Sequence, residues 1–487
     1  MSINFPIIIK VVGAISFCIG ALMLIPLVIA FTADLNSCNG LFYSSMIGLV
    51  LGAVLYAITR KANPKLGKRE GYLIVSLGWL TAGIISALPY LLTDLEITLF
   101  DGIFESISGM TTTGATIFTD IEALPSGILL WRSMTQWIGG MGIIVLTVAI
   151  FPLLGIGGVE LFVAESPGPT SNKIHPRIKE TAKRLWLLYL GISVLIIIAL
   201  RLLGMTTFDA VNHGLTTVAT GGFSTKNASM AAFGPAIQYC VLFFMFVAGI
   251  NYSLIYAGIR GKFSKVWQSD EFKAYVGLVV LSIVLVTSVK LYHTDIGIEK
   301  AFRDGAFHVI SLITTTGYVS ADYTLWHPSL TVFCFMLLFA GACAGSTAGG
   351  IKIIRHMVFA KNSFLEFKRI LHPNGLIRLR IDNQLVAPRI LTHVLVFLLI
   401  YLAIFAVGTV IMTFMIPDVD QPLLTSAGAV ATSLGNVGPA IGGLGPTDNF
   451  AHLPAVAKVF LSFIMLLGRL ELFSILILFS PYFWKSN

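Results

Sequence analysis

The chain has 487 residues, of which 56% are hydrophobic and only 11% are charged, and its mean hydropathy is +0.86. Soluble globular proteins carry about 25% charged residues, so the composition excludes that class and predicts a polytopic membrane protein. The net charge of +8 does not indicate a nucleic-acid partner, because membrane topology explains where the basic residues lie. The five cysteines form no CxxC motif, which argues against a disulfide framework or a thiolate metal site.

Ten apolar stretches are long enough to cross a hydrocarbon core of about 30 Å. The first is too long for the apolar region of a cleavable signal peptide, so we interpret it as an uncleaved helix. In chain order the predicted spans are 3–32, 40–59, 71–93, 128–155, 185–204, 235–258, 274–293, 329–359, 389–416 and 453–483.

Positive charge divides the connecting loops into two sets. The loops opposite the basic set hold only Lys226, Lys300 and Arg303. The basic set holds 22 Lys and Arg residues and comprises the loops 59–70, 156–184, 259–273 and 352–389. By the positive-inside rule this set faces the cytoplasm, which predicts a multi-pass protein with both termini cytoplasmic.

Four short segments between the spans look like copies of one another. In the first three, an aspartate stands thirteen positions before the last glycine, and an ionisable residue (Glu105, His213 or His308) follows that aspartate by four places. We predict four half-helices, the first three starting near their aspartates, each followed by a turn near the middle of the membrane. The segments are Asp101–Gly114, Asp209–Gly222, Asp304–Gly317 and Thr425–Gly438.

The tetrapeptide that ends each segment is the candidate cation site. Glycine permits backbone angles that turn carbonyl oxygens toward a common axis, and alkali cations in selective pores are held by such oxygens. Threonine adds a hydroxyl oxygen or a hydrogen bond behind the turn. The alternative is a set of re-entrant turns that only pack. The candidates are Thr111, Thr112, Thr113, Gly114, Ala219, Thr220, Gly221, Gly222, Thr314, Thr315, Thr316, Gly317, Gly435, Asn436, Val437 and Gly438.

The whole pattern predicts an all-α polytopic membrane protein with four pseudo-symmetric helix–pore-loop–helix repeats around one pore, preceded by two transmembrane helices. The predicted units are the leading helices (1–70), repeats one to four (71–155, 185–258, 274–359 and 389–483) and two cytoplasmic loops (156–184 and 360–388).

Two features of the later spans suggest a gate. A run of small residues, Gly341–Gly350, interrupts the eighth span and predicts an intramembrane loop that blocks the pore, with a close helix crossing as the alternative. Arg469 lies about midway along the last span, where a charge must face the interior or water; it is either a pore charge or a structural partner of helix ends or of Glu471. The candidate gating residues are Gly345, Ser346, Thr347, Ala348, Gly349, Gly350 and Arg469.

At these residues the chain resembles the TrkH/TrkG potassium-uptake proteins of bacteria, in the superfamily that includes KtrB and plant HKT transporters. The resemblance covers the leading helices, the four repeats and their turns, the GACAGSTAGGIK stretch and the GRLELF stretch. It implies potassium uptake across the bacterial inner membrane through a carbonyl-lined filter. The implied filter glycines are Gly114, Gly222 or Gly221, Gly317, and Gly438 or Gly435.

The resemblance also implies a gate and partners. The family's gating loop corresponds to Gly345–Gly350 and its pore arginine to Arg469. Family members are homodimers that sit on a cytosolic ring of RCK-type nucleotide-binding subunits, called TrkA in this branch, and Lys361–Arg380 is a candidate contact. Sodium-conducting relatives carry serine where this chain has Gly114, which favours potassium. The implied cargo is K+, with no organic cofactor.

Two other functions are alternatives to a passive pore. A proton- or sodium-coupled potassium symporter on the same scaffold requires a titratable or second-ion site, for which Glu105, His213, His308 and Glu471 are the candidates. A membrane enzyme requires catalytic side chains gathered at a membrane face. The sequence holds no HExxH, GxSxG or catalytic His/Cys/Asp set, so we do not expect an enzyme.

Overall fold

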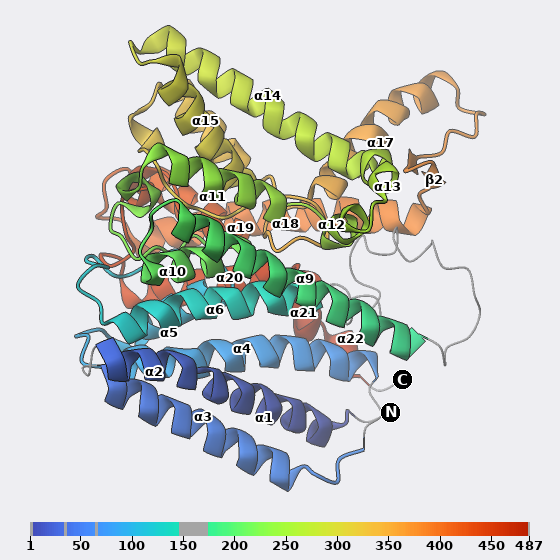
Figure 1. Ribbon diagram of the computed structural model, residues 1–487. Coiled ribbons are helices and arrows are strands. Elements are labelled where there is room, and N and C mark those ends of the chain that lie inside the picture. The colour runs from blue at the N-terminus through green and yellow to red at the C-terminus, as the bar shows by residue number, and fades with distance from the viewer. Residues whose placement is uncertain (1–2, 34–36, 64–66, 146–173, 486–487) are drawn as a thin grey trace.

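The computed structural model describes residues 3–33, 37–63, 67–145 and 174–485, and helices make up most of it (Figure 1). Most of the predicted loop 156–184 and the end of the fourth predicted span lie outside the described residues. Within them, six helices are long and apolar enough to cross a membrane: Phe5–Thr32, Cys38–Ile58, Lys68–Leu92, Glu180–Leu202, Asp270–His293 and Pro388–Met415.

The elements follow the predicted order of two leading helices and four repeats. The leading part contains α1 (Phe5–Leu22), α2 (Leu24–Ala33) and α3 (Cys38–Ile58). The first repeat contains α4 (Lys68–Leu92), α5 (Leu99–Met110) and α6 (Ser126–Val145), and the second contains α9 (Ile174–Leu202), α10 (Thr207–Val218), α11 (Pro235–Ala248), α12 (Tyr252–Ile259) and α13 (Phe263–Gln268).

The third repeat contains α14 (Asp270–His293), α15 (Ile298–Ile313), α16 (Pro328–Leu337) and α17 (Ile353–Leu371), followed by a small antiparallel hairpin of β1 (Arg380–Ile381) and β2 (Gln384–Leu385). The fourth contains α18 (Pro388–Met415), α19 (Pro422–Gly435), α20 (Ala455–Arg469), α21 (Phe473–Leu476) and α22 (Pro481–Trp484). Short 3-10 turns occupy Ser229–Ala232, Tyr323–Leu325, Gly442–Leu444 and Ile477–Phe479.

The half-helices α5 and α10 begin as their aspartates predict. Thr98 is the N-cap of α5: the backbone N–H of Asp101 donates to its hydroxyl (3.3 Å), and its own N–H donates to the Asp101 carboxylate (3.0 Å). On α10 the N–H of Asp209 donates to the Thr206 hydroxyl (3.1 Å), and that hydroxyl donates to the Asp209 carboxylate (2.8 Å). These caps satisfy N–H groups that have no partner inside the helix.

For α15 the predicted start near Asp304 is wrong. The helix begins at Ile298, and the Asp304 carboxylate instead accepts a hydrogen bond from Lys290 Nζ on α14 (3.0 Å). Both side chains are largely buried, so each provides the opposite charge that makes burial of the other tolerable. The aspartate therefore joins two helices rather than capping one.

Two predicted spans are bent rather than straight, and a third, the eighth, is interrupted as its run of small residues predicted. The sixth bends by 104° between α11 and α12, and the last bends by 108° after α20. The eighth is helical only to Leu337 and becomes helical again at Ile353. Asn251 starts α12 by accepting the N–H of Ser253 at 2.8 Å, and Glu471 and Leu472 adopt left-handed φ angles of 54° and 57°.

The two termini lie at the same end of the molecule as α13, α17 and the hairpin (Figure 1). Buried residues of α17 lie only in its first two turns, so the rest of this helix extends away from the bundle. The predicted eighth span, 329–359, thus consists of a short helix, the predicted break, which extends over residues 338–352, and the start of a projecting helix.

Close packing of the leading helices depends on glycine. A Cβ on Gly48 of α3 would lie 2.9 Å from the Cα of Gly20 on α1, and one on Gly52 would lie 2.5 Å from the backbone nitrogen of Phe17. Small residues let the two helix backbones approach each other. The buried apolar residues beyond this contact form two main cores, one uniting the leading helices with repeats one and four, the other uniting repeats two and three.

Candidate ion-binding ring and the loop against it

The tetrapeptides adopt one backbone conformation in all four repeats. We name them turn 1 (Thr111–Gly114), turn 2 (Ala219–Gly222), turn 3 (Thr314–Gly317) and turn 4 (Gly435–Gly438). The second residue of each turn has a left-handed φ: Thr112 53°, Thr220 52°, Thr315 54° and Asn436 54°. The fourth residue also has a positive φ: Gly114 81°, Gly222 81°, Gly317 78° and Gly438 103°.

The repeated φ angles show which glycines of turns 2 and 4 correspond to Gly114, a choice that the sequence left open. Gly222, rather than Gly221, corresponds to Gly114, and Gly438, rather than Gly435, is its counterpart in turn 4. Residues other than glycine rarely adopt these φ angles, which explains why the fourth position is glycine throughout.

The turns meet in a closed ring. In each repeat, a Cβ added to the fourth residue would collide with the third carbonyl oxygen of the next turn, and the last turn returns to the first. The distance from the Cβ on Gly114 to the Gly221 oxygen would be 2.3 Å, and from Gly222 to the Thr316 oxygen 2.0 Å. From Gly317 to the Val437 oxygen it would be 1.9 Å, and from Gly438 to the Thr113 oxygen 2.6 Å. Segments more than three hundred residues apart thus surround one axis.

Threonine braces turns 1 and 3 from within. The hydroxyls of Thr111 and Thr113 lie 2.8 Å apart, as do those of Thr314 and Thr316. Thr111 also donates to the carbonyl of Ile107 at 2.7 Å, which ties the turn to its half-helix. Of the two roles predicted for threonine, these hydroxyls therefore serve the hydrogen bond that supports the turn.

Turn 4 is braced differently because it has no threonine. Asn436 donates its side-chain amide to Thr113 Oγ1 of turn 1 (3.0 Å) and to the carbonyl of Met465 on α20 (2.9 Å). The asparagine therefore connects the last repeat to the first at the point where the ring closes.

A cavity of about 150 Å³ opens on one side of the ring, and the four fourth-position glycines all line it. Arg132, Lys226 and Asp448 are the charged side chains in its wall. Two acidic residues of the loop around the first repeat are paired with basic residues from elsewhere in the chain: Asp101 with Lys458 (2.6 Å) and Glu122 with Lys226 (3.4 Å).

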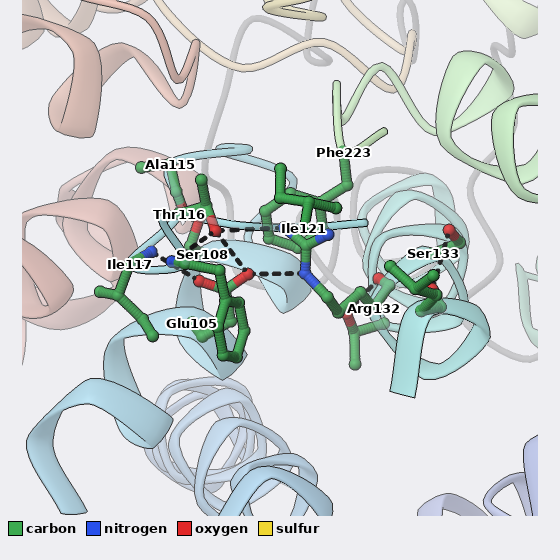
Figure 2. A network of polar contacts seen from close by, with 12 residues as sticks. Glu105, Ser108, Ala115, Thr116, Ile117, Ile121, Arg132, Ser133 and Phe223 are labelled. Carbon is green, nitrogen blue, oxygen red and sulfur yellow. Dashed lines mark hydrogen bonds and ion pairs between the residues drawn. The ribbon is translucent and has the colours of Figure 1, made fainter. Parts of the chain in front are cut away.

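The buried pair of Glu105 and Arg132 supports the wall of this cavity (Figure 2). Glu105, on α5, accepts hydrogen bonds from Arg132 Nε (2.8 Å), Ile117 N (2.9 Å) and Thr116 Oγ1 (3.1 Å). The Arg132 guanidinium also lies 4.2 Å from the ring centre of Phe223, in the strand that leaves turn 2. One ion pair thus holds together the exits of turns 1 and 2.

The two half-helix histidines lie at equivalent positions. His213 is buried, with Nδ1 2.8 Å from the carbonyl of Asp209 and Nε2 2.9 Å from Ser224 Oγ. His308 repeats the first contact, to Asp304 O at 2.9 Å. Its Nε2 has no hydrogen-bond partner among the described residues, and Val319 stands where the second repeat has Ser224.

The non-helical stretch between α16 and α17, residues 338–352, is named here the small-residue loop. Gly349 N donates to Thr315 Oγ1 of turn 3 (2.7 Å), and Thr347 Oγ1 donates to the carbonyl of Val218 at the end of α10 (3.1 Å). A Cβ on Gly349 would lie 2.6 Å from the Gly435 oxygen of turn 4. The loop touches the first half of the turns, whereas the cavity touches their last residues, so the two lie on opposite sides of the ring.

Arg469 lies at the end of α20, next to the bend rather than midway along a straight helix. It is buried, and it donates to the carbonyl of Thr347 in the small-residue loop (2.9 Å) and to that of Gly139 on α6 (3.2 Å). Glu471 is not its partner, since that carboxylate pairs with Arg355 at the start of α17.

The far side of the small-residue loop is held by the second and third repeats. Ala344 N donates to the buried carboxylate of Glu271 at the start of α14 (2.6 Å), and Cys343 N donates to the carbonyl of Gly249 (3.1 Å). The Gly345 carbonyl accepts the N–H of Tyr252, the first residue of α12. The bend in the sixth span thus supplies contacts that a straight helix would not.

The site contains residues that the sequence prediction missed. Arg132 carried a signal, because a lone arginine in an apolar span needs a partner and Glu105 was already singled out. Glu271 carried none, since an acid at the start of a span looks like an ordinary helix cap. Gln136, on α6 behind turn 2, was also missed.

Comparisons with known proteins agree with this architecture. The sequence model of the TrkH family, described as cation transport protein, matches residues 39–486. The chain is 38% identical to the Trk system potassium uptake protein TrkH of Salmonella typhimurium over 99% of this chain and all of that protein. It is 34% identical to TrkG of Escherichia coli over 95% of each chain.

Among solved structures, the crystal structure of the potassium transporter TrkH from Vibrio parahaemolyticus superposes with a TM-score of 0.91. The sequence identity is 34%, and the match covers 99% of this chain and 100% of that one.

Proposed function

The chain belongs to the TrkH family of cation transport proteins, and we propose that it takes up potassium through the ring formed by turns 1 to 4. Closure of that ring is the observation that carries the proposal: four turns of the same backbone conformation, from all four repeats, surround one axis. Carbonyl oxygens arranged around an axis can replace the hydration shell of a K+ ion. The membrane potential would drive entry, at about 2.3 kcal/mol per charge for each 100 mV.

The proposed filter consists of the sixteen residues of the four turns. Its ligands are backbone oxygens, and no carboxylate belongs to any turn, which suits a monovalent ion better than a divalent one. The cavity beside the fourth-position glycines is the proposed entrance.

The small-residue loop and Arg469 form the proposed gate, with Gly345–Gly350 as its moving part. Supporting this, the loop lies against the side of the ring opposite the cavity, and its contacts come from different repeats. Each is a single hydrogen bond of the kind worth about 0.5–1.5 kcal/mol, or about 1.5–3 kcal/mol for the bond from the charged Arg469. Regulation of such a loop requires only modest free energy.

The proposed setting is the bacterial inner membrane, with both termini cytoplasmic, in a homodimer bound to a cytosolic RCK-type ring like TrkA. The similar proteins are named as members of a Trk system, which supports a multicomponent assembly. The end of the molecule with both termini, α17 and the hairpin (Figure 1) carries the basic stretch Lys361–Arg380 and is the proposed contact with the ring of regulatory subunits.

Ion flux in liposomes tests the proposal. The purified chain should conduct K+ in preference to Na+, and deletion of Gly345–Gly350 should raise the flux per protein. Absence of any K+ preference would refute the filter. If transport after the deletion fell only in proportion to protein abundance, the gate would be refuted instead.

The coupled symporter remains the second candidate because of one observation, the Nε2 of His308, which has no hydrogen-bond partner among the described residues. The other candidate groups are engaged: Glu105 by Arg132, Glu471 by Arg355 and His213 by Ser224. Reversal potentials measured with the pH or sodium gradient inverted decide between the two functions, because coupling would make the potential follow the second ion.

A further inference from the structure

Turn 2 lacks the internal brace of turns 1 and 3. The bracing hydroxyls there belong to the first and third residues, as in Thr111 and Thr113. Turn 2 has Ala219 and Gly221 at those positions, so no side-chain hydroxyl is available at either. Its backbone nevertheless has the same left-handed angle at Thr220, 52°, as the braced turns have. Inside the turn, the Thr220 hydroxyl donates to the Ala219 carbonyl (2.7 Å), but this bond does not join the first and third residues. A side-chain brace at those positions has to come from outside the turn.

Gln136 of α6 occupies the place of the missing side chain. Its Nε2 donates to the carbonyl of Gly221 at 2.6 Å, and its Oε1 accepts the N–H of Phe223 at 3.0 Å. The glutamine is fully buried. A Cβ on Gly221 would lie 2.3 Å from Oε1 and 2.4 Å from Cδ of Gln136. Because Gly221 does not have a left-handed φ, the space taken by Gln136, rather than backbone strain, is what requires glycine there.

The glutamine is specific to the first repeat. The second helix of each repeat starts at or directly after a proline, and the residue eleven positions beyond that proline is Gln136, Phe246, Phe339 or Met465. Gln136 and Met465 are equivalent by their contacts as well as by this count. Three residues further on, Gly139 lies against the carbonyl of Met110, directly before turn 1, and Gly468 lies against that of Leu434, directly before turn 4. Only the helix that faces turn 2 carries an amide at this position.

The bond to Gln136 makes one oxygen of the ring different from its counterparts. The third-position carbonyls of Thr113, Thr316 and Val437 accept no hydrogen bond from any described residue, whereas that of Gly221 accepts one. An amide N–H that occupies one lone pair both fixes the direction of a carbonyl and lowers the negative potential it offers a cation. Of the four third-position carbonyl oxygens in the ring, three are thus free and one, that of Gly221, is restrained.

We propose that Gln136 is a positioning residue that sets the selectivity of the pore by holding the Gly221 carbonyl. The inference rests on the proposed function, because selectivity has meaning only if the ring conducts ions. It assigns turn 2 a brace from another repeat, and it predicts that losing the brace changes which ion passes rather than merely how much protein folds.

The first test replaces Gln136 by methionine, the residue that the fourth repeat carries at this position. The full chain is purified into liposomes, and the K+/Na+ permeability ratio is obtained from reversal potentials. Q136M should lower that ratio by about two- to tenfold, as expected for the loss of one hydrogen bond. A ratio equal to that of the unmodified chain would overturn the inference. No selectivity in the unmodified chain would instead refute the proposed function.

Ser133→Ala is the matched control. Ser133 lies on the same helix and donates to Asn212 Oδ1 of α10 at 2.7 Å, so this variant also removes a buried hydrogen bond between the first two repeats. It does not touch turn 2, and its permeability ratio should be unchanged. A fall as large as that of Q136M would mean that any loosening of α6 alters selectivity, which would also overturn the inference.

A double-mutant cycle tests the same contact without ion flux. Gly221→Ala should lower the unfolding temperature because its new methyl group collides with Gln136, while Gln136→Ala should lower it because the carbonyl loses its donor. In the double variant the methyl group enters the vacated space, so its loss of stability should be smaller than the sum of the single losses. Additive losses would contradict the fit of Gln136 to Gly221.

Discussion

The ring of turns and the small-residue loop are both non-helical backbone inside the helix bundle, yet they are held in different ways. Each turn repeats one conformation and touches the next through backbone atoms, so a change in one displaces its neighbours. The loop belongs to the third repeat alone and is held by separate hydrogen bonds: some involve side chains such as Thr315 and Arg469, and others join it to the backbone at the bend of the sixth span. Mutual backbone contact suits a fixed ligand set, and separable bonds suit an element that moves.

This difference predicts two kinds of variant. Changes that disturb the ring should alter the permeability ratio, whereas changes that release the loop should alter the flux and leave the ratio alone. The following predictions test that division, beginning with the largest expected effect.

Glu105→Gln should be the most damaging change. It leaves the buried guanidinium of Arg132 without its carboxylate, and breaking a buried pair costs about 3–5 kcal/mol of the free energy of unfolding. The exits of turns 1 and 2 should loosen, so the unfolding temperature and the K+/Na+ permeability ratio should both fall.

The control for this variant is Glu122→Gln. Glu122 pairs with Lys226 at 3.4 Å, but both side chains are substantially exposed, and exposed pairs contribute little. An equal effect of the two variants would show that burial of the Glu105 pair does not matter to the ring.

Gly114→Ser places a side chain where the Gly221 oxygen lies 2.3 Å away, at a φ of 81°. Left-handed strain and overpacking together cost roughly 2–4 kcal/mol, and turns 1 and 2 should separate. The permeability ratio should fall toward parity. Gly191→Ala, at a glycine of α9 with open space around it, should change neither the ratio nor the abundance. An unchanged ratio for Gly114→Ser would contradict the filter assignment.

Arg469→Gln should release the small-residue loop. The charged donor to the Thr347 carbonyl is lost, and such bonds are worth about 1.5–3 kcal/mol, so flux per protein should rise by roughly ten- to a hundredfold with an unchanged permeability ratio. Arg469→Lys keeps the charge but loses the second arm of the guanidinium, and its flux should lie between those of the glutamine variant and the unmodified chain. A changed ratio would place Arg469 with the ring instead of the gate.

Thr347→Val should have the smallest effect. It removes the hydroxyl that donates to the Val218 carbonyl while keeping the side-chain shape, and one neutral hydrogen bond corresponds to about a two- to tenfold rise in flux. Thr409→Val is the comparison, because that hydroxyl donates within its own helix, to Phe405 O at 2.8 Å. Equal flux in both variants would argue against a role for Thr347 in holding the loop.

Local pattern predicted the repeats because each one carries its own signal. The aspartate-to-glycine spacing and the Thr/Gly composition indicate a half-helix and a turn wherever they occur, and Gly341–Gly350 indicated a break in a helix that the structure confirms. The bend after Gly249 went unpredicted because the spans on both sides of it are apolar enough to pass as one helix, and the capping role of Asn251 was not recognised. Propensity does not reveal that the bend provides a carbonyl acceptor for the backbone N–H of Cys343.

Contacts between repeats were the least predictable part. Nothing near Gly221 in the sequence indicates that its brace comes from Gln136, 85 residues earlier. Likewise, the register of turn 2 could not be chosen between two adjacent glycines until the φ angles of the four turns were compared. Pairing across a ring depends on which helix faces which turn, and that is a property of the assembled bundle.

Closure of the ring also constrains how the protein is made. The bond from Asn436 to Thr113 joins residues 323 positions apart, and at about 5–20 residues per second a ribosome needs on the order of tens of seconds to synthesise that interval. During that time turn 1 is already in the bilayer without its last neighbour. The nascent chain must therefore keep an unfinished polar centre shielded, and a protein truncated before its final repeat would lack turn 4 and could not close the ring.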